Sequence, residues 1–403
     1  MSEGTPRNVE SRGVASAESR SFPAPPRPGE LSADRATTSW LELFYDLVLV
    51  AATIVFSNTY SHDIDWENSL WLAGMFAVLW WAWFQTTELT NRDRTDSLSR
   101  RVVLLAQMFV ITIFTVVGGN AVTTHTFYAA EVAGVLLITV AALAHDIRRT
   151  VPDLRRMATI RRNALLIGGV LAILSGTLPD GPRYVLWAVG WIIVVAPPLL
   201  PRYDDPIAKS RSDSHHLAER FGLLTMIVLG ESFVKVALTA SGRQLHQINY
   251  LVLALEFLIV FAVWILYFDD VNRLGPPEAN FGRKVWMLAH MPLQLSIVAM
   301  AVGLAQWETL KISSQLTALD VRLFTTPLAG IYVVLAIIGV TTPRPSRAIV
   351  VGLRLVTAAA VIGIGLLAWR VDSVSVELAA GLDAAAVLTC AGVTEWIRVR
   401  RPA

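Results

Sequence analysis

Charged side chains interrupt an otherwise apolar segment, residues 216–238, which reads HLAERFGLLTMIVLGESFVKVAL. Glu219 and Arg220 are adjacent near its start, and Glu231 and Lys235 lie one helical turn apart beyond its midpoint. An ionisable group at the centre of a membrane helix costs about 2.5–3.5 kcal/mol, so such groups usually have a partner or a function. The order of Glu231 and Lys235 favours an intrahelical ion pair, which predicts either a structural link between helices or part of a solute pathway.

Three further ionisable residues lie in the first half of other apolar segments, as Glu219 and Arg220 do in theirs. Glu42 and Asp46 are four residues apart in an apolar segment and therefore share one helix face. At about 1.5 Å per residue they lie about 6 and 12 Å into that segment, and His290 lies about 7 Å into its own. Together with Glu219 and Arg220 they predict a polar site for an ion or small solute, in which an acid or His290 could exchange protons.

Structural roles are also consistent with these positions. Glu42, Glu219 and Arg220 lie near the ends of their predicted helices, where acids in a first turn interact favourably with the helix dipole. Arg220 could simply neutralise Asp46 or Glu42. His290 could be a hydrogen-bonded histidine of the core. The sequence alone leaves these roles open beside the functional ones.

The composition is that of a membrane protein. Of the 403 residues, 54% are hydrophobic and 16% are charged, whereas soluble domains have about 45–50% apolar and about 25% charged residues. A helix needs about 20 mostly apolar residues to cross a bilayer. We predict an all-α polytopic membrane protein with about 12 transmembrane helices, at roughly residues 38–60, 69–88, 101–119, 126–145, 162–178, 184–200, 217–238, 249–268, 285–304, 321–340, 348–369 and 374–397. The fifth and sixth segments are short, so whether both are full crossings is left open.

Basic residues indicate how the bundle is oriented. With a cytoplasmic N-terminus, the cytoplasmic segments carry 26 Arg and Lys residues and the opposite side carries 4, which is a strong positive-inside bias. We therefore predict a multi-pass protein of the cell membrane, surrounded by the lipid bilayer, with both termini in the cytoplasm. Residues 1–36 contain no apolar stretch typical of a cleavable signal peptide, and we expect them to form a disordered cytoplasmic tail.

The chain contains an internal repeat. Residues 68–92 and 249–273 align without gaps at an offset of 181, with eight identities in 25 positions. Matched pairs in and around this alignment are Glu42 and Glu219, Trp83 and Trp264, Glu88 and Asp269, Asn91 and Asn272, and Gln107 and His290. We predict two parallel six-helix repeats, residues 37–200 and 201–403, as in transporters whose repeats are related by an axis along the membrane normal.

Several function classes lack support. None of the HExxH, GxSxG, Walker A or GxGxxG patterns occurs in a suitable context, and the chain has one cysteine, Cys390. The net charge of +2 does not favour nucleic-acid binding. We therefore expect no enzymatic activity, no cofactor, no metal site and no nucleic-acid partner. Any transport would run on a gradient or be passive, and the sequence does not indicate an oligomeric state.

Two stretches resemble a known family. The segments WLELFYDLVLVAA at 40–52 and HLAERFGLLTMIVLGES at 216–232 are similar to the two signature stretches of the bacterial low temperature requirement A (LtrA) family. The resemblance covers about residues 36–400 and implies a polytopic integral membrane protein of a family named for a growth defect in the cold. The polar motif positions of the family fall on Glu42, Phe44, Asp46, Glu219, Arg220, Phe221, Gly230, Glu231 and Ser232.

A second similarity concerns the sequence FYD at 44–46, which resembles an element in the first span of lysosomal and bacterial potassium channels built from six-span units. The second half has FGL at 221–223 and lacks the acid. We predict a gradient-driven transporter of an ion or small solute, with a polar site between the two repeats. The alternatives are a passive cation channel and a non-transporting membrane protein that supports growth in the cold.

Overall fold

The structure is a computed structural model that describes most of the chain from Ser39 onward. The described residues are Met1, 39–62, 64–92, 97–124, 127–149, 152–200, 213–278, 280–343, 346–371 and 373–400. The chain divides into two compact units, residues 1–37 and 38–403. Apart from Met1, the tail predicted over residues 1–36 lies outside the described residues.

Long α-helices make up nearly all of the second unit. In chain order they are α1 (Trp40–His62), α2 (Trp66–Arg92), α3 (Leu98–Thr124), α4 (Phe127–Arg148), α5 (Arg155–Ser175), α6 (Asp180–Leu199), α8 (Ser214–Ser241), α9 (Tyr250–Leu266), α10 (Asn280–Glu308), α11 (Ala318–Thr341), α12 (Arg347–Arg370) and α13 (Val376–Arg400). Short 3-10 helices precede α5 and α9, at η1 (Pro152–Leu154) and η3 (Leu245–Gln247), and the π-helix η4 (Tyr267–Asn272) continues α9. In the described ranges the β-structure is an isolated bridge between Gln315 and Ser375.

The predicted all-α polytopic architecture is confirmed. Each of the twelve predicted segments coincides with a long helix, and eleven of the described helices are long and apolar enough to cross a membrane. The fifth and sixth segments are the separate helices α5 and α6, with 21 and 20 residues, so both have the length of a full crossing. The parallel repeat and the cytoplasmic position of the termini stay predictions.

Helix α2 occupies the centre of the bundle. Its residues 79–91 are all buried, because α2 contacts α1, α3, α4, α8 and α10. A helix that is surrounded by protein needs no apolar surface toward lipid, so α2 can carry Gln85, Thr86 and Glu88 in its buried part. Of the twelve long helices described, α2 is the one that is not a candidate membrane span by hydropathy, and its polar residues lower its mean hydropathy.

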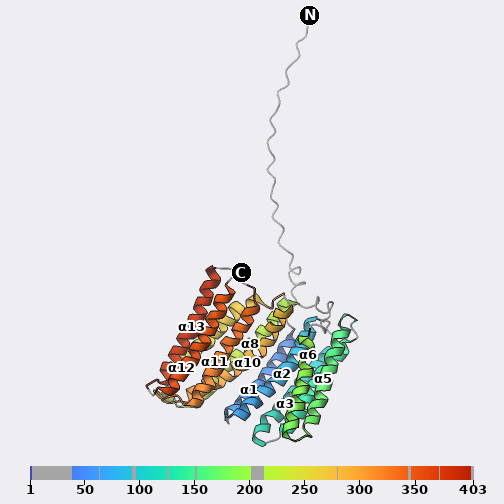
Figure 1. Cartoon of the computed structure of the whole chain (residues 1–403), viewed down its shortest axis with the longest axis horizontal. Helices are drawn as coiled ribbons and strands as arrows, with labels where there is room; N and C mark the ends of the chain where they lie inside the picture. Colours follow the sequence, from blue (N-terminus) through green and yellow to red (C-terminus); the bar gives the residue numbers. More distant parts are fainter. Residues whose placement is uncertain are drawn as a thin grey trace. The chain divides into compact units, whose positions relative to one another are not determined.

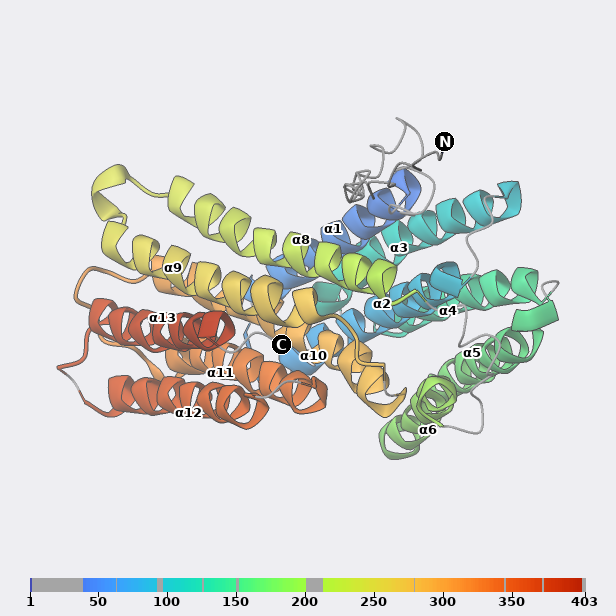
Figure 2. The ribbon, with the colours of Figure 1, turned by 90° about the horizontal axis from the view of Figure 1, so that it is seen from above.

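The two halves of the chain meet along four helices. In the first half α3, α4, α5 and α6 pack in sequence, and in the second half α10, α11 and α12 do so. Between these groups, α1 and α2 contact α8 and α10. Figures 1 and 2 show α5 and α6 on one side of these central helices and α12 and α13 on the other. Most of the buried apolar side chains of both halves form one continuous cluster.

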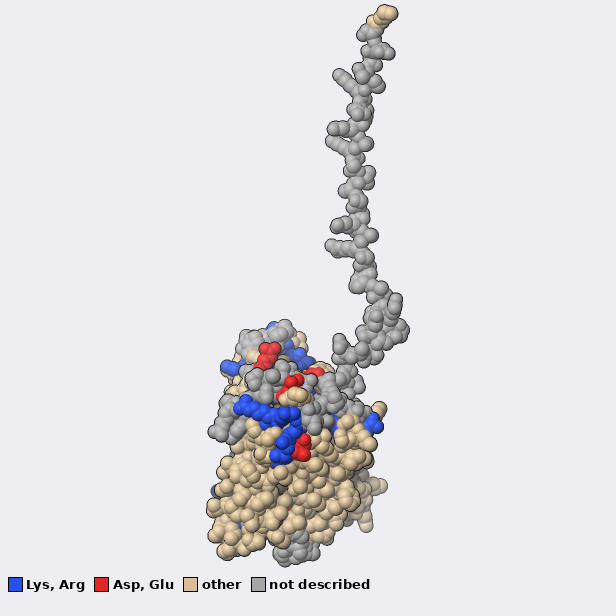
Figure 3. Space-filling model, turned by 90° about the vertical axis from the view of Figure 1, so that its right-hand side faces the viewer, with Lys and Arg blue, Asp and Glu red and all other residues tan. Residues whose placement is uncertain are grey.

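Charged side chains are unevenly distributed along the helices. On the face shown in Figure 3, the Lys, Arg, Asp and Glu side chains gather toward one end, and the described surface beyond them carries almost no charge. Large apolar side chains such as Ile192, Phe257 and Val356 are exposed on the outer faces of their helices. An uncharged apolar surface of this kind suits the hydrocarbon core of a bilayer.

Helix α10 approaches α11 closely at Gly303. A Cβ atom at this position would lie 2.6 Å from the carbonyl oxygen of Leu323 and 2.8 Å from the Cα of Phe324. Backbone atoms cannot rotate aside as the end of a flexible side chain can. Small residues permit such close approaches between membrane helices.

Substitution Gly303→Ala should push α10 and α11 apart and destabilise the fold by about 1–3 kcal/mol, the usual cost of overpacking. The thermal unfolding midpoint of the detergent-solubilised protein measures this loss. Gly352→Ala on α12 is the matched control, because a Cβ there meets nothing within 4 Å. Equal midpoints for the two variants would contradict the close approach.

Candidate functional site

An ion pair between the two halves of the chain forms the centre of the candidate site. Arg220 of α8 donates a hydrogen bond from Nη2 to Oδ1 of Asp46 on α1, at 2.7 Å. The indole of Trp83 on α2 donates to the same oxygen, also at 2.7 Å. The side chains of Arg220 and Asp46 are 1% and 0% exposed. Each charge therefore depends on the other for its stability in an apolar interior.

Glu42 extends this network toward the end of the bundle at which α1 begins. It forms a capping box with Ser39, whose backbone N–H donates to the Glu42 carboxylate at 3.1 Å and whose hydroxyl accepts from the Glu42 N–H at 3.3 Å. The carboxylate also pairs with Arg100 of α3. His216 Nε2 lies 3.7 Å and Arg220 Nη1 lies 3.8 Å from its second oxygen. Glu42 thus both caps α1 and belongs to the network.

Some polar atoms at the centre of the network have no hydrogen-bond partner among the described residues. They are Oδ2 of Asp46 and both Nε and Nη1 of Arg220. Thr87 gives Nη2 of Arg220 a second contact, at a long 3.5 Å. Leaving buried charged groups partly unbonded is costly, so the arrangement suits an additional small polar ligand. Within the described ranges, no three His, Cys, Asp or Glu side chains are grouped as a metal site would require.

His290 lies beside the network and is separated from the central ion pair by the aromatic rings of Phe221 and Trp83. Its Nε2 is 2.9 Å from the hydroxyl of Tyr267, and its Nδ1 is 2.6 Å from the carbonyl oxygen of Trp286. Phe221 packs edge-on against His290 and against Trp83, with ring centroids 4.8 and 4.9 Å apart. Ring contacts through Phe221 and Trp83 therefore connect His290 to the central ion pair.

Glu231 and Lys235 are connected through α1. The hydroxyl of Ser57 donates to Oε1 of Glu231 at 2.6 Å and accepts from Nζ of Lys235 at 3.1 Å. Lys235 also donates to the side-chain oxygen of Asn58 at 2.7 Å. The sequence predicts a direct ion pair between Glu231 and Lys235 along α8. In the structure, the Ser57 hydroxyl of α1 bonds to both side chains and so connects them.

Glu219 lies apart from the network, although it is adjacent to Arg220 in the sequence. Consecutive residues of an α-helix point about 100° apart, and the Glu219 side chain is half-buried whereas Arg220 is buried. The structure thus brings Glu42, Asp46 and Arg220 together. The other predicted site residues lie outside this centre, and a functional role for any of them stays a prediction.

Sequence reasoning missed three members of the network, namely Trp83, Arg100 and His216. Trp83 carried a detectable signal, because it is one of the matched positions of the repeat. Asn91 is another matched position, and its side-chain oxygen lies 3.2 Å from Nδ1 of His216. Arg100 had no comparable signal, because a basic residue near a helix end is already explained by the orientation of the bundle.

Each half also contains a buried pair of an acid and an arginine at equivalent places. Glu88 of α2 binds Arg161 of α5 at 2.5 Å, and Asp270 of η4 binds Arg354 of α12. The ungapped alignment of the halves matches Glu88 with Asp269, the residue directly before Asp270. Both Asp269 and Asp270 lie in the π-helix η4, which accommodates one extra residue relative to an α-helix.

A second contact recurs at positions that the predicted repeat relates. Nε2 of Gln107 donates to the hydroxyl of Thr86 at 3.0 Å, and Nε2 of His290 lies 2.9 Å from the hydroxyl of Tyr267. Gln107 aligns with His290, and Thr86 aligns with Tyr267 at the offset of 181. The third helix of each half is therefore bonded to the second at matching positions.

Comparison with known proteins shows where the chain belongs. Residues 37–393 match the family described as bacterial low temperature requirement A protein (LtrA). The chain belongs to this family. It is also similar to the uncharacterized protein RA0937 of Rhizobium meliloti (strain 1021), with 26% identity over 284 residues, which are 67% of this chain and 69% of the relative. The part that matches the LtrA family contains the whole of the network around Asp46 and Arg220.

In this LtrA family protein, removing one member of the central pair should destabilise the fold more than removing both. Asp46→Asn leaves the buried, charged Arg220 with Glu42, at 3.8 Å, as its remaining acidic partner in the network. We expect a loss of up to about 3–5 kcal/mol, the cost of breaking a buried ion pair, and the double variant Asp46→Asn/Arg220→Gln should recover part of that loss. Unfolding midpoints of the single and double variants form a double-mutant cycle that measures the coupling.

The control for this cycle is Asp146→Asn. Its partners Arg149 and Arg162 are partly exposed, and Asp146 is itself 43% exposed, so we expect an unfolding midpoint close to that of the wild type. Strictly additive losses at Asp46 and Arg220 would show that the two side chains are not coupled.

The bridging hydroxyl of Ser57 gives a further prediction for this member of the LtrA family. Ser57→Ala removes one hydrogen-bond partner from each of Glu231 and Lys235 inside the bundle, and we expect a loss of about 1–3 kcal/mol in the free energy of unfolding. Thr59→Ala on the same helix is the matched control, because the Thr59 hydroxyl bonds to the carbonyl of Val55 within α1. An equally small loss in both variants would contradict the bridge.

Proposed function

We propose that this LtrA family protein is a gradient-driven transporter of an ion or a small polar solute, whose binding site lies between the two halves of the chain. The observation that carries the proposal is the buried Asp46–Arg220 pair, which joins the first helix of one half to the first helix of the other. In transporters built from two repeats, the substrate site lies at the interface of the repeats. The Asp46–Arg220 pair would lie at that place here.

The unbonded atoms of the pair supply a means of binding. In the proposed cycle, Oδ2 of Asp46 would bond to a cation and Nε or Nη1 of Arg220 to an anionic group, because these buried atoms have no hydrogen-bond partner among the described residues. A solute that bonds to one member of the pair weakens its bond to the other. Binding would then loosen the contact between α1 and α8 without leaving a charge unpaired.

The recurring contacts in the two halves support a movement of one half against the other. The Glu88–Arg161 and Asp270–Arg354 pairs each join the second and fifth helices of a single half. These pairs stabilise each half internally, whereas the Asp46–Arg220 pair links the halves. In the proposed cycle the halves move as units about the central helices, and the central pair breaks and reforms.

Flux measurements test this function. Purified protein would be reconstituted in liposomes, and a panel of cations, anions and small polar solutes would be screened for uptake with and without an imposed proton or cation gradient. We expect gradient-dependent uptake of at least one solute. Asp46→Asn should lower that uptake by roughly tenfold or more, equivalent to a loss of about 1.4 kcal/mol or more.

Asp146→Asn serves as the control and should retain uptake, because it changes a partly exposed acid outside the network. Ohmic current in planar bilayers without coupling to a second gradient would identify a passive channel instead. Folded wild-type protein that moves none of the panel, under any gradient, would overturn the transport proposal in favour of a non-transporting role.

A further inference from the structure

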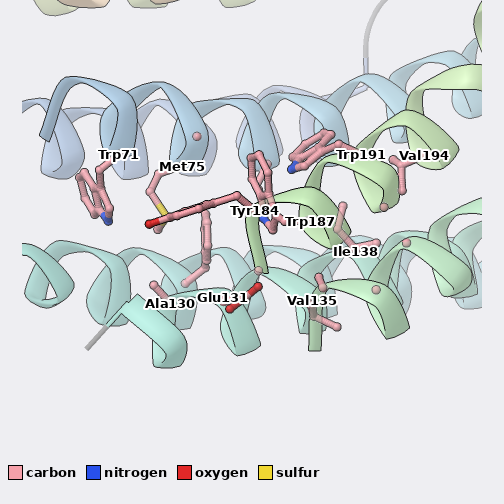
Figure 4. A pocket seen from close by; sticks show the side chains of 18 of the residues that line it. Trp71, Met75, Ala130, Glu131, Val135, Ile138, Tyr184, Trp187, Trp191 and Val194 are labelled. Atoms are coloured by element: carbon pink, nitrogen blue, oxygen red, sulfur yellow. The ribbon is translucent and has the colours of Figure 1, made fainter. Parts of the chain in front are cut away.

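A cavity lies in the first half of the chain between α2, α4, α5 and α6 (Figure 4). Its volume is about 550 Å³, within the range of about 300–1,000 Å³ typical of ligand pockets. Figure 4 shows Trp71 and Met75 of α2 facing Tyr184 and Trp187 of α6, with Val135 of α4 on the opposite wall. Apolar and aromatic side chains therefore form most of the surface.

The cavity occupies the place of a helix contact that the second half makes. There α13 packs along α9, whereas the described residues of α2 and α6, which hold the same places in the first half, make no comparable contact. Helix α6 packs against α5 instead, and a Cβ atom on Gly168 of α5 would lie 2.3 Å from the side chain of Val194 on α6. Close packing on α5 thus leaves α6 apart from α2.

The length of the cavity matches one leaflet of a bilayer. Its wall on α6 runs from Arg183 to Val194, which is about 16 Å at about 1.5 Å per residue. The hydrocarbon core of a bilayer is about 30 Å thick, so one leaflet contributes about 15 Å. Tyr184 and Trp187 are 66% and 39% exposed, and their rings offer apolar contact along this length.

One end of the cavity is polar. Glu131 of α4 accepts from Nη2 of Arg183 at 3.2 Å and from the hydroxyl of Ser175 at 2.8 Å, so each carboxylate oxygen has a partner. The Arg183 side chain remains 29% exposed. A planar guanidinium presents several N–H groups that suit a phosphate. The carboxylate holds Arg183 at the wall of the cavity, and the partial exposure of its guanidinium leaves it accessible to a ligand.

We propose that this cavity binds one acyl chain of a bilayer phospholipid, with the phosphodiester of that lipid against Arg183. The acyl chain would fill the space between α2 and α6 and supply the contact that a helix supplies in the second half. None of the residues involved belongs to the network around Asp46, so this proposal does not depend on the proposed transport function.

Gly74 provides a means of closing the cavity without disturbing the protein around it. It lies on α2 in the wall of the cavity, and a Cβ atom there would meet nothing within 4 Å. Gly74→Leu therefore places a side chain in the space assigned to the lipid. Gly352→Leu on α12 is the matched control, because Gly352 is also half-buried and free of neighbours within 4 Å.

Photolabelling tests the proposal on the full-length protein. Nanodiscs would contain a phosphatidylglycerol with a diazirine on one acyl chain, and adducts would be located by proteolysis and mass spectrometry after irradiation. We expect adducts on Trp71 and Met75 in excess of those on Val356 and Leu366, which are exposed on α12. Gly74→Leu should reduce the adducts in the cavity by roughly tenfold, and Gly352→Leu should leave them unchanged.

Two further samples distinguish binding of the lipid head group from binding of the acyl chain. Arg183→Gln should lower labelling by the phospholipid, and a free fatty acid with the same diazirine should label the cavity less than the phospholipid does. Labelling by the fatty acid alone would overturn the phospholipid assignment. Adducts spread evenly over all exposed helix faces, or adducts unchanged by both Gly74→Leu and Arg183→Gln, would overturn the site itself.

Discussion

The buried ion pair between Asp46 and Arg220 is the interaction on which the arrangement of the two halves depends. Neither charge could remain in an apolar interior alone, so α1 and α8 must lie side by side with these two positions facing each other. The Trp83 indole of the central helix α2 donates a second hydrogen bond to the same Asp46 oxygen. The register of three helices from both halves follows from one pair of charges.

The sequence predicted the helices well because crossing a bilayer imposes a length and an apolar composition that are local properties. The capping box of Ser39 and Glu42 also has a local spacing, but the sequence analysis predicts only an interaction of Glu42 with the helix dipole. Neutralisation of Asp46 by Arg220 is among the roles that the sequence leaves open, but the contribution of Arg100 from α3 is not predictable. Which side chains meet across helices depends on packing, and packing has no signal in a single stretch of sequence.

Each half contains six long helices, and the two sets pack differently at their outer edges. In the second half the last helix, α13, lies against α9, and in the first half α6 stays with α5 and leaves a cavity beside α2. The polar contacts inside each half are matched, as the pairs Glu88–Arg161 and Asp270–Arg354 show. The difference between the halves therefore lies in apolar packing, where a lipid can replace protein, and the ionic contacts are retained.

The π-helix η4 has a consequence for how the chain length can vary. Because it contains one residue more than an α-helix of the same span, a single-residue deletion upstream of Asp270 within η4 would restore a regular α-helix and still present the acid to Arg354. The same deletion in α2 before Glu88 would rotate that acid by about 100° away from Arg161. Natural length variation of one residue is therefore expected at the end of the eighth long helix, α9, and not at the end of α2.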